Sequence, residues 1–404
     1  MPGIYHLKGS IKHYEWGGKN FIPDLLQQPN PGAKPCAEYW LGVHPQDDCR
    51  ILTEHGELLL KVYLRQHAAL LGEQVQKQFG HLPYLLKVLD VKDMLSIQVH
   101  PTKAEAEKGF ARENELAIPL TAPNRNYKDD NHKPELMVAL GDFWLLHGFR
   151  QPGEIELMLK TIPEFYPLLT VWYHEGLKGL YAHLMRMPQE NVNEILQPLL
   201  RRILPLYDTG KLDKHHPDFW AARADRTFSK NGQADRGIFS VYLFNLLHLT
   251  KGQGIFQDAG LPHAYLEGQN VEIMANSDNV LRGGLTPKHI DVDELLKHVV
   301  CTPTTVRIME GNGVAGTEVL YACPVPDFQL GQFTLNKTQT ARVSPLTAEI
   351  LLLLSGSFLA EAGGKQVTLK AGEPAAIVFP GDEVILTALT DCTVFRATVP
   401  PGSR

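Results

Sequence analysis

The period of the hydrophobic pattern changes twice along this 404-residue chain, and that change restricts the folds open to it. Residues 1–150 contain short apolar segments alternating with polar residues and separated by Gly, Pro, Asn and Asp, a pattern typical of β-strands. Between 151 and 235 apolar residues recur at helical spacing, and prolines divide the stretch into short helices. From about 240 the alternation returns. We therefore expect a mainly β protein with a helical insertion.

The β-rich stretches before and after residue 311 differ in their polar motifs and turns. Residues 236–310 carry dense polar motifs between their apolar residues, as residues 1–150 do. Residues 311–404 instead show short strands separated by glycine turns, typical of a small barrel or sandwich. A chain of this length is expected to form two or three domains.

Charge and cysteine usage exclude several classes of function. The formal net charge is −6 with both signs mixed, which predicts no nucleic-acid partner. No apolar run approaches the roughly 20 residues of a membrane span. The five cysteines are scattered, and the N-terminus has no signal-like pattern, so we expect reduced thiols, a cytoplasmic location and no cysteine zinc site.

Two apolar strands carry ligand-type side chains on one face. In "MLSIQVH", Ser96, Gln98 and His100 alternate with buried-looking residues, so they share a face of the strand. His263 and Tyr265 are related in the same way. Neutral imidazole and amide oxygen, together with a carboxylate, suit Zn²⁺ or a similar ion.

Spacing alone leaves the carboxylate open between two residues. Glu105 follows His100 by five positions but lies among alternating charges on an apparently exposed helix. Glu135 begins "ELMVAL", a strand whose alternate residues point inward. A carboxylate at the mouth of a buried strand has more reason to bind a metal, so we favour Glu135.

Several motifs together resemble a known family. These are "AEYWLGVHP" (37–45), "PYLLKVLD" with "LSIQVHP", "YKDDNHKPE", "PHAYLEG" and "EIMANSDNVLRGGLTPKHID". In this order they resemble the type I phosphomannose isomerases, zinc enzymes of the cupin superfamily. The resemblance implies cupin (jelly-roll) barrels: a catalytic cupin domain of residues 1–150 and 236–310, an inserted helical domain of 151–235, and a C-terminal cupin-like barrel of 311–404.

The resemblance also implies a metal site and a reaction. One Zn²⁺ per chain would be held by Gln98, His100, Glu135 and His263. The expected reaction interconverts mannose 6-phosphate and fructose 6-phosphate by moving a proton between C1 and C2 through a cis-enediol(ate). We expect a monomer whose partner is its small-molecule substrate.

The other site residues divide into two groups. Arg282 would stabilise the enediolate or hold phosphate, because its charge is permanent. The base stays open among Asp278, Lys133 and Glu272, with Asp278 favoured because it lies in the most specific motif. The expected substrate-binding residues are Ser96, Lys87, Tyr265, Lys288 and Glu272.

Three alternatives compete with this interpretation. A non-catalytic sugar-binding cupin would be favoured by loss of a ligand, but all four ligand positions are present. A metal-dependent dioxygenase would favour further histidines over Gln98. An isomerase acting on another sugar phosphate fits the same motifs, because specificity depends on the shape of the pocket.

Overall fold

Strand β13 (His263–Ala275) is the longest strand and organises the larger sheet, which has 11 strands among the residues that the structure describes. The structure is a computed structural model that describes residues 3–45, 47–311 and 313–402. The first residues of β13 pair with β10 and β8, whereas its later residues pair with β7 and β9. The sheet therefore changes partners halfway along β13, at the level of Gly268.

The main path of this sheet runs through β11 (Phe244–Leu249), β10 (Phe143–Phe149), β13, β7 (Tyr84–Val91), β3 (Glu38–His44) and β2 (Ser10–Lys12). Its remaining strands are β12 (Gly254–Gln257), β9 (Glu135–Ala139), β8 (Gln98–Val99), β14 (Leu281–Arg282) and β4 (Asp47–Asp48).

A second sheet combines both ends of the chain. Its order is β15 (Glu318–Tyr321), β16 (Gln329–Leu335), β23 (Cys392–Thr398), β18 (Glu349–Ser355), β21 (Ala375–Val378), β1 (Ile4–Lys8), β5 (Arg50–Thr53) and β6 (Gly56–Leu59). A small sheet of β17 (Thr340–Val343), β22 (Val384–Ala388), β19 (Phe358–Ala362) and β20 (Lys365–Leu369) packs against it through a shared apolar cluster.

The pairing of β1 with β21 crosses the boundary that the sequence suggested. Ile4 lies opposite Val378, and Leu7 lies opposite Ala375, so the N-terminal strand is part of the sheet built mainly after residue 311. Residues 4–59 contribute strands to both large sheets, so the sheets do not follow the order of the chain. The expected domain division at 311 remains a prediction.

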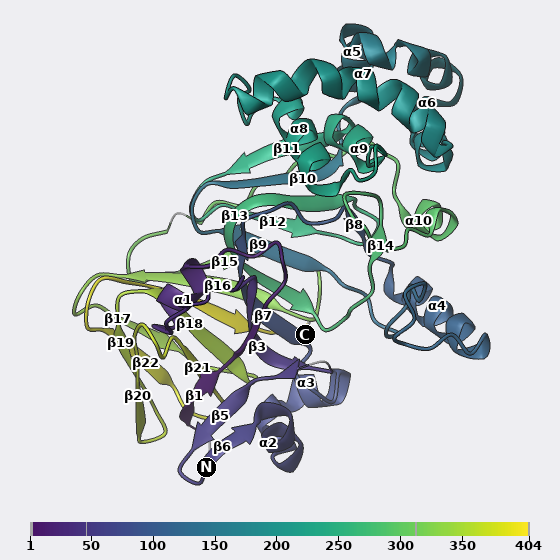
Figure 1. The fold of residues 1–404 in the computed structure, drawn as a ribbon. Coiled ribbons are helices and arrows are strands. Elements are labelled where there is room, and N and C mark those ends of the chain that lie inside the picture. The colour runs from purple at the N-terminus through teal and green to yellow at the C-terminus, as the bar shows by residue number, and fades with distance from the viewer. Residues whose placement is uncertain (1–2, 46, 312, 403–404) are drawn as a thin grey trace.

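Helices gather at one end of the molecule (Figure 1). They are α5 (Pro152–Thr161), η2 (Pro163–Leu168), α6 (Leu169–Arg186), α7 (Gln189–Asp208), α8 (Pro217–Phe228) and α9 (Gly237–Leu243). Elsewhere lie α1 (Phe21–Leu25), α2 (Leu60–Gln66), η1 (Ala68–Leu71), α3 (Glu73–Gln78), α4 (Lys103–Glu115) and α10 (Val292–His298).

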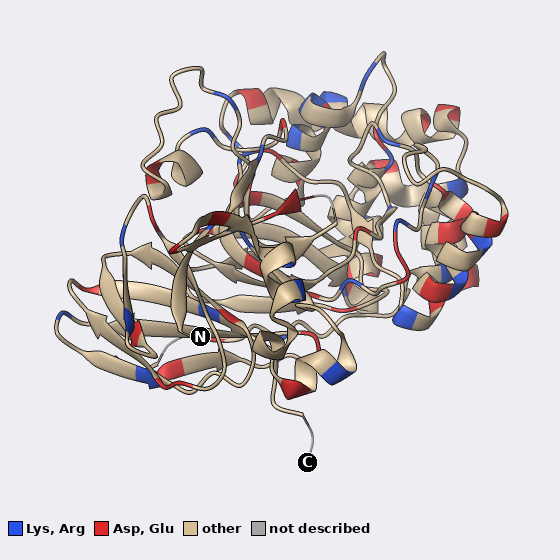
Figure 2. Ribbon diagram, turned by 90° about the horizontal axis from the view of Figure 1, so that it is seen from below, with Lys and Arg blue, Asp and Glu red and all other residues tan. Residues whose placement is uncertain are grey.

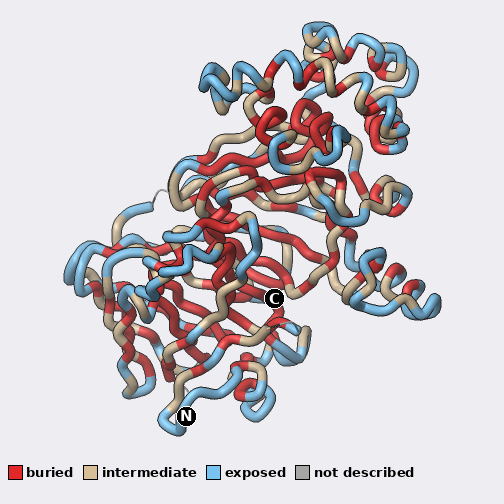
Figure 3. The backbone as a smooth tube through the Cα atoms, in the orientation of Figure 1, coloured by how far each residue is buried: buried red, intermediate tan, exposed pale blue. Residues whose placement is uncertain are grey.

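The helical segment packs on the β10–β11 side of the larger sheet. In α7, Val192, Leu196, Leu199 and Ile203 recur every three or four residues and are all buried, as an amphipathic helix requires. The ring of Phe149 at the end of β10 lies 5.1 Å from Tyr181 of α6 and 4.9 Å from Phe244 of β11, measured between ring centroids. These edge contacts join helices and sheet into one continuous core (Figure 3).

The prediction of a sheet-rich protein with several helices is confirmed. In the view of Figure 2, basic and acidic residues are interspersed over the helices. Among the described residues, no helix combines the length and apolar character needed to cross a membrane.

Candidate metal centre and adjoining cleft

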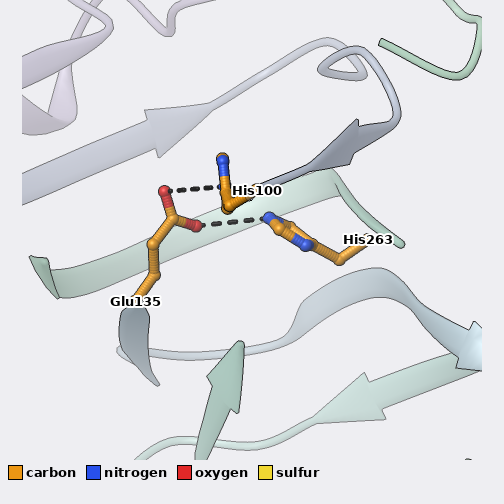
Figure 4. A group of neighbouring side chains, drawn as sticks. All are labelled: His100, Glu135 and His263. Atoms are coloured by element: carbon orange, nitrogen blue, oxygen red, sulfur yellow. Dashed lines mark ion pairs between the residues drawn. The ribbon is translucent and has the colours of Figure 1, made fainter. Parts of the chain in front are cut away.

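Three ligand-type side chains, His100, Glu135 and His263, meet inside the larger sheet (Figure 4). All three are buried, and their donor atoms lie within 4.8 Å of one another. His100 Nε2 lies 3.5 Å from Glu135 Oε1, and His263 Nε2 lies 3.3 Å from Glu135 Oε2. His100 directly follows β8, while Glu135 and His263 each begin a strand. Segments distant in sequence thus converge on one point.

The hydrogen bonds of the two histidines select the tautomer that a metal requires. His100 Nδ1 lies 2.8 Å from the carbonyl of Asn279, and His263 Nδ1 lies 3.0 Å from the carbonyl of Leu261. A carbonyl only accepts, so each Nδ1 carries the hydrogen and each Nε2 keeps a lone pair. Both Nε2 atoms are buried without a hydrogen-bond partner. Two inward-facing lone pairs beside a carboxylate fit a zinc ion.

Burial also sets the charge of these groups. Desolvation lowers the pKa of His100 to about 4, so its imidazole is neutral at physiological pH. Burial alone would raise the pKa of Glu135, but the ammonium of Lys133 and the two imidazoles outweigh it and hold that pKa well below its usual range. Lys133 Nζ lies 3.1 Å from Glu135 Oε1. His100 therefore presents a neutral nitrogen and Glu135 an ionised carboxylate, the forms that bind metal.

Strand register places Gln98 and Arg282 beside the metal ligands. Gln98 lies opposite His263 between β8 and β13, and Arg282 lies opposite Gln98 between β14 and β8. Directly paired residues project to the same side of a sheet, so a slip of one residue would turn His263 away from the other ligands. Glu105, the rejected carboxylate, lies partly exposed on α4 and pairs with Lys108 at 2.8 Å.

A turn at Gly260 joins two of the ligand segments. Its backbone N–H donates to the carbonyl of His100 at 2.8 Å. Gly260 has a φ of 76°, and a Cβ there would meet Val300 Cγ2 at 2.6 Å and the carbonyl of His298 at 2.9 Å. Only glycine fits this turn, which sets the direction of the chain into His263.

A cleft of ≈ 940 Å³ opens beside the three ligands. Six of the predicted site residues line it: Ser96, Gln98, Lys133, Asp278, Arg282 and Lys288. Lys133 contacts both the cleft and Glu135, so it connects the open space with the buried group. Asp278 Oδ1 lies 3.6 Å from His44 Nε2, whose pKa desolvation lowers to about 4.

The other three predicted residues form a buried network and are not among the described residues that line the cleft. Lys87 Nζ donates to Glu272 Oε1 at 3.0 Å, and the hydroxyl of Tyr265 donates to Glu272 Oε2 at 2.9 Å. Burial opposes the charge of Lys87, but the carboxylates of Glu272 and Glu38 outweigh it and raise the pKa of Lys87 above its usual value. Substrate contact by these residues remains a prediction.

The motif containing Asn279 has a structural role that sequence reasoning missed. The Asn279 amide donates to the carbonyls of Asp129 and Asn131, both at 2.8 Å, and accepts from the backbone N–H of Lys128 at 2.7 Å. Two of the family-like motifs, residues 127–135 and 272–291, are therefore joined by one side chain. The backbone carbonyl of the same residue, Asn279, orients His100.

Comparisons with known proteins agree with this geometry. Residues 4–152 match the family model for the type I phosphomannose isomerase catalytic domain. The chain is 38% identical over 378 residues to mannose-6-phosphate isomerase of Shigella flexneri, covering 92% of this chain and 94% of that protein. It is 33% identical over 430 residues to the human mannose-6-phosphate isomerase, covering 98% of each. The chain belongs to the type I phosphomannose isomerase family.

Solved structures of this family have the same fold. A crystal structure of mannose 6-phosphate isomerase bound with zinc and yttrium superposes with a TM-score of 0.87 at 32% identity, covering 98% of this chain and 100% of that chain. The apo form from Salmonella typhimurium gives a TM-score of 0.87 at 32% identity, covering 99% and 100%. The family resemblance stated from the motifs is confirmed.

The sequence reasoning missed several residues of the cleft. Lys128, Lys230, Thr286 and Tyr14 line it. The ring of Tyr14 stacks at 5.8 Å on Trp16, which the sequence had indicated as a wall residue. Lys128 and Thr286 lie inside family motifs, which was an available signal. Lys230 lies at the end of the helical segment, where no local pattern indicates a site.

Proposed function

We propose that this chain is a zinc-dependent mannose-6-phosphate isomerase, interconverting mannose 6-phosphate and fructose 6-phosphate through a cis-enediol(ate). The observation that carries the proposal is the buried group of His100, Glu135 and His263. Each histidine Nε2 faces Glu135 without a hydrogen-bond partner among the described residues, and the group adjoins a cleft whose lining includes Lys133, Arg282 and Lys288. Membership of the family supports the same reaction.

Gln98, His100, Glu135 and His263 would hold the ion, one per chain. Three neutral ligands and one carboxylate leave a net charge of about +1 on a bound Zn²⁺, which would supply Lewis-acid polarisation of the substrate oxygens. Lys133 balances the charge of Glu135 from the cleft side. The backbone carbonyls of Asn279 and Leu261 fix the orientation of the two imidazoles.

The residues of the cleft supply the remaining requirements of the reaction. Asp278 is proposed as the base that moves the proton between C1 and C2, with Lys133 as the second candidate. Arg282 stabilises the negative charge that develops on the enediolate oxygens. Ser96 and Lys288, which both line the cleft, bind the substrate.

The buried network of Lys87, Glu272 and Tyr265 is proposed to support the wall behind the metal ligands. Glu272 accepts two hydrogen bonds there. This leaves Glu272 a weaker candidate for the base than Asp278, which lines the cleft.

We also propose that the strands around the ligands form a cupin-type barrel. Support comes from β13, whose two halves pair with different neighbours and so carry the sheet around the metal group. The sheet that contains β1 and β21 is proposed to form a second cupin-like unit. The helices of α5–α9 are inserted between β10 and β11 of the first unit.

The test couples metal content to turnover. Zinc bound to the purified protein is quantified, and fructose 6-phosphate formation from mannose 6-phosphate is assayed before and after chelation. About one zinc per chain, with activity lost on chelation and restored by zinc, is the expected result. Zinc without isomerisation would favour a sugar-binding protein or another sugar phosphate as substrate, and full activity after verified metal removal would contradict the ligand assignment.

A further inference from the structure

The connection between α8 and α9 forms part of the cleft, although it belongs to the helical segment. Thr227, Phe228 and Lys230 line the cleft together with Arg282 and Lys288. The helical segment therefore reaches the substrate space itself, and one of the residues it brings there is a cation.

The backbone that carries Lys230 is held in a fixed turn. Lys230 and Gln233 exchange backbone hydrogen bonds of 3.2 and 2.9 Å. Asn231 and Gly232 between them have φ values of 53° and 73°, as a two-residue type I′ turn requires. Gln197 of α7 donates to the carbonyl of Gly232 at 2.8 Å. A cation on a fixed backbone loses less entropy when it binds a ligand.

Asp235 ties this turn to the loop that carries the other two cations. Its Oδ1 accepts from the backbone N–H groups of Gly237 at 2.7 Å and Leu285 at 2.8 Å, and its Oδ2 accepts from Thr286 at 3.2 Å. Leu285 has a φ of 54°, a backbone conformation that residues other than glycine rarely adopt. The hydrogen bonds to Asp235 stabilise that unusual backbone, which lies between Arg282 and Lys288.

The backbones of Gly284 and Gly237 also lie in close contact where the loop of residues 282–288 meets the helical segment. A Cβ on Gly284 would lie 2.4 Å from Gly237 Cα, and Gly284 has a φ of 125°. The carbonyl of Gly284 accepts from the N–H of Ile97 at 3.0 Å, one residue before Gln98. The loop of residues 282–288 is thus clamped between the metal-site strand and the helical segment.

The three cations at this junction lack acidic partners. Across the described ranges, no carboxylate oxygen lies within the 4.0 Å ion-pair distance of Lys230, Arg282 or Lys288. Arg223, on the neighbouring helix α8, shows the usual alternative, because its guanidinium pairs with Glu267. Unpaired cations on the wall of a cleft provide a site for an anion.

We infer that Lys230 of the helical segment binds the phosphoryl group of the sugar phosphate together with Lys288, next to Arg282 at the reacting carbons, and that Asp235 is a positioning residue for this site. The inference rests on the proposed isomerase function, because that function supplies the sugar phosphate. It gives the helical segment a direct part in recognising the phosphorylated end of the substrate.

The test compares variants of the zinc-loaded full chain in two assays, steady-state isomerisation of mannose 6-phosphate and direct binding of inorganic phosphate. Lys230→Met keeps the aliphatic stem and removes the charge. It should raise KM and the dissociation constant for phosphate about tenfold, with kcat within about twofold, since one charge-assisted contact is lost. Lys230→Arg should retain most of both. Lys211→Met, an exposed lysine of the same segment that is not among the cleft residues, should change neither.

Asp235 is tested by the same split between KM and kcat. Asp235→Ala should raise KM and weaken phosphate binding, whereas Asp235→Asn should recover part of both because its side-chain oxygen still accepts from Gly237 and Leu285. Unchanged KM and phosphate binding in Lys230→Met would overturn the inference, as would a fall in kcat alone. A wild-type protein that binds phosphate through Lys230 but isomerises nothing would refute the proposed reaction and leave the anion site standing.

Discussion

Replacing Asn279 by alanine should weaken both the fold and the metal site. The side chain is fully buried and makes five hydrogen bonds. Its amide nitrogen donates to the Asp129 carbonyl at 2.8 Å, the Asp129 carboxylate at 3.1 Å and the Asn131 carbonyl at 2.8 Å. Its oxygen accepts from the backbone N–H groups of Lys128 at 2.7 Å and Asp129 at 3.3 Å. Asn279→Ala removes these hydrogen bonds from Lys128, Asp129 and Asn131, which are half-buried.

The size of the effect follows from that inventory. Each net hydrogen bond contributes about 1 kcal/mol, and five that share one side chain are not additive, so the expected loss in free energy of unfolding is about 3–5 kcal/mol. Because the Asn279 carbonyl orients His100, zinc affinity should also fall by roughly 10- to 100-fold, as for other groups that orient metal ligands.

Asn276 provides a matched control three residues away on the same loop. Its amide makes one hydrogen bond, to the carbonyl of Leu82 at 2.8 Å, and its side-chain oxygen has no partner. Asn276→Ala should therefore cost only about 1 kcal/mol and leave zinc affinity unchanged. Urea unfolding of the metal-free proteins gives the first quantity, and competition with a chelator gives the second. Equal losses in the two variants would refute the reasoning.

Three further predictions test separate parts of the molecule. Asp278→Asn should retain zinc and lower kcat by about 10²- to 10⁴-fold in steady-state assays, as expected for loss of a general base; a change confined to KM would exclude it as the base. Burial depresses the pKa of His100 from 6.5 to about 4. The stabilisation that neutral His100 gives the metal-free protein is therefore complete above about pH 6.5 and is lost as the pH falls towards 4. The free energy of unfolding, measured across this range, should fall less in His100→Gln than in the wild type. Arg396 donates to Glu318 at 2.6 Å and to Glu349 at 2.7 Å, so Arg396→Met should destabilise the protein by about 3–5 kcal/mol, seen by urea unfolding, yet leave KM for mannose 6-phosphate unchanged.

The direction of the ligand side chains could be predicted because it depends on residue spacing within each strand. Alternation in "SIQVH" puts Gln98 and His100 on one face, and the burial pattern of "ELMVAL" separates Glu135 from Glu105. The structure brings His100, Glu135 and His263 together. Spacing within a strand determines which way each side chain points, whereas the full ligand set from several distant segments was implied by the family resemblance.

The pairing of β1 with β21 was not predictable in the same way. An apolar strand such as "IYHLK" can pair with any exposed edge, and its alternation carries no information about which one. Ile4 and Val378 are paired although they lie at opposite ends of the chain. The sequence divided the molecule by changes in composition along the chain, whereas the sheet is assembled by contacts between distant segments.

The cleft shows why the same limit applies to function. Lys87 lies in a family motif and was predicted to bind substrate, but its ammonium lies buried against Glu272. Lys230 lies in no motif, yet it lines the cleft because a turn fixed by α7 carries it there. A lysine's chemistry is the same in both places, and only the carboxylates around it differ. Lys87 has a buried acidic partner and supports the wall, whereas Lys230 pairs with no carboxylate of the described residues and faces the cleft. That distinction depends on packing between segments, which a motif does not record.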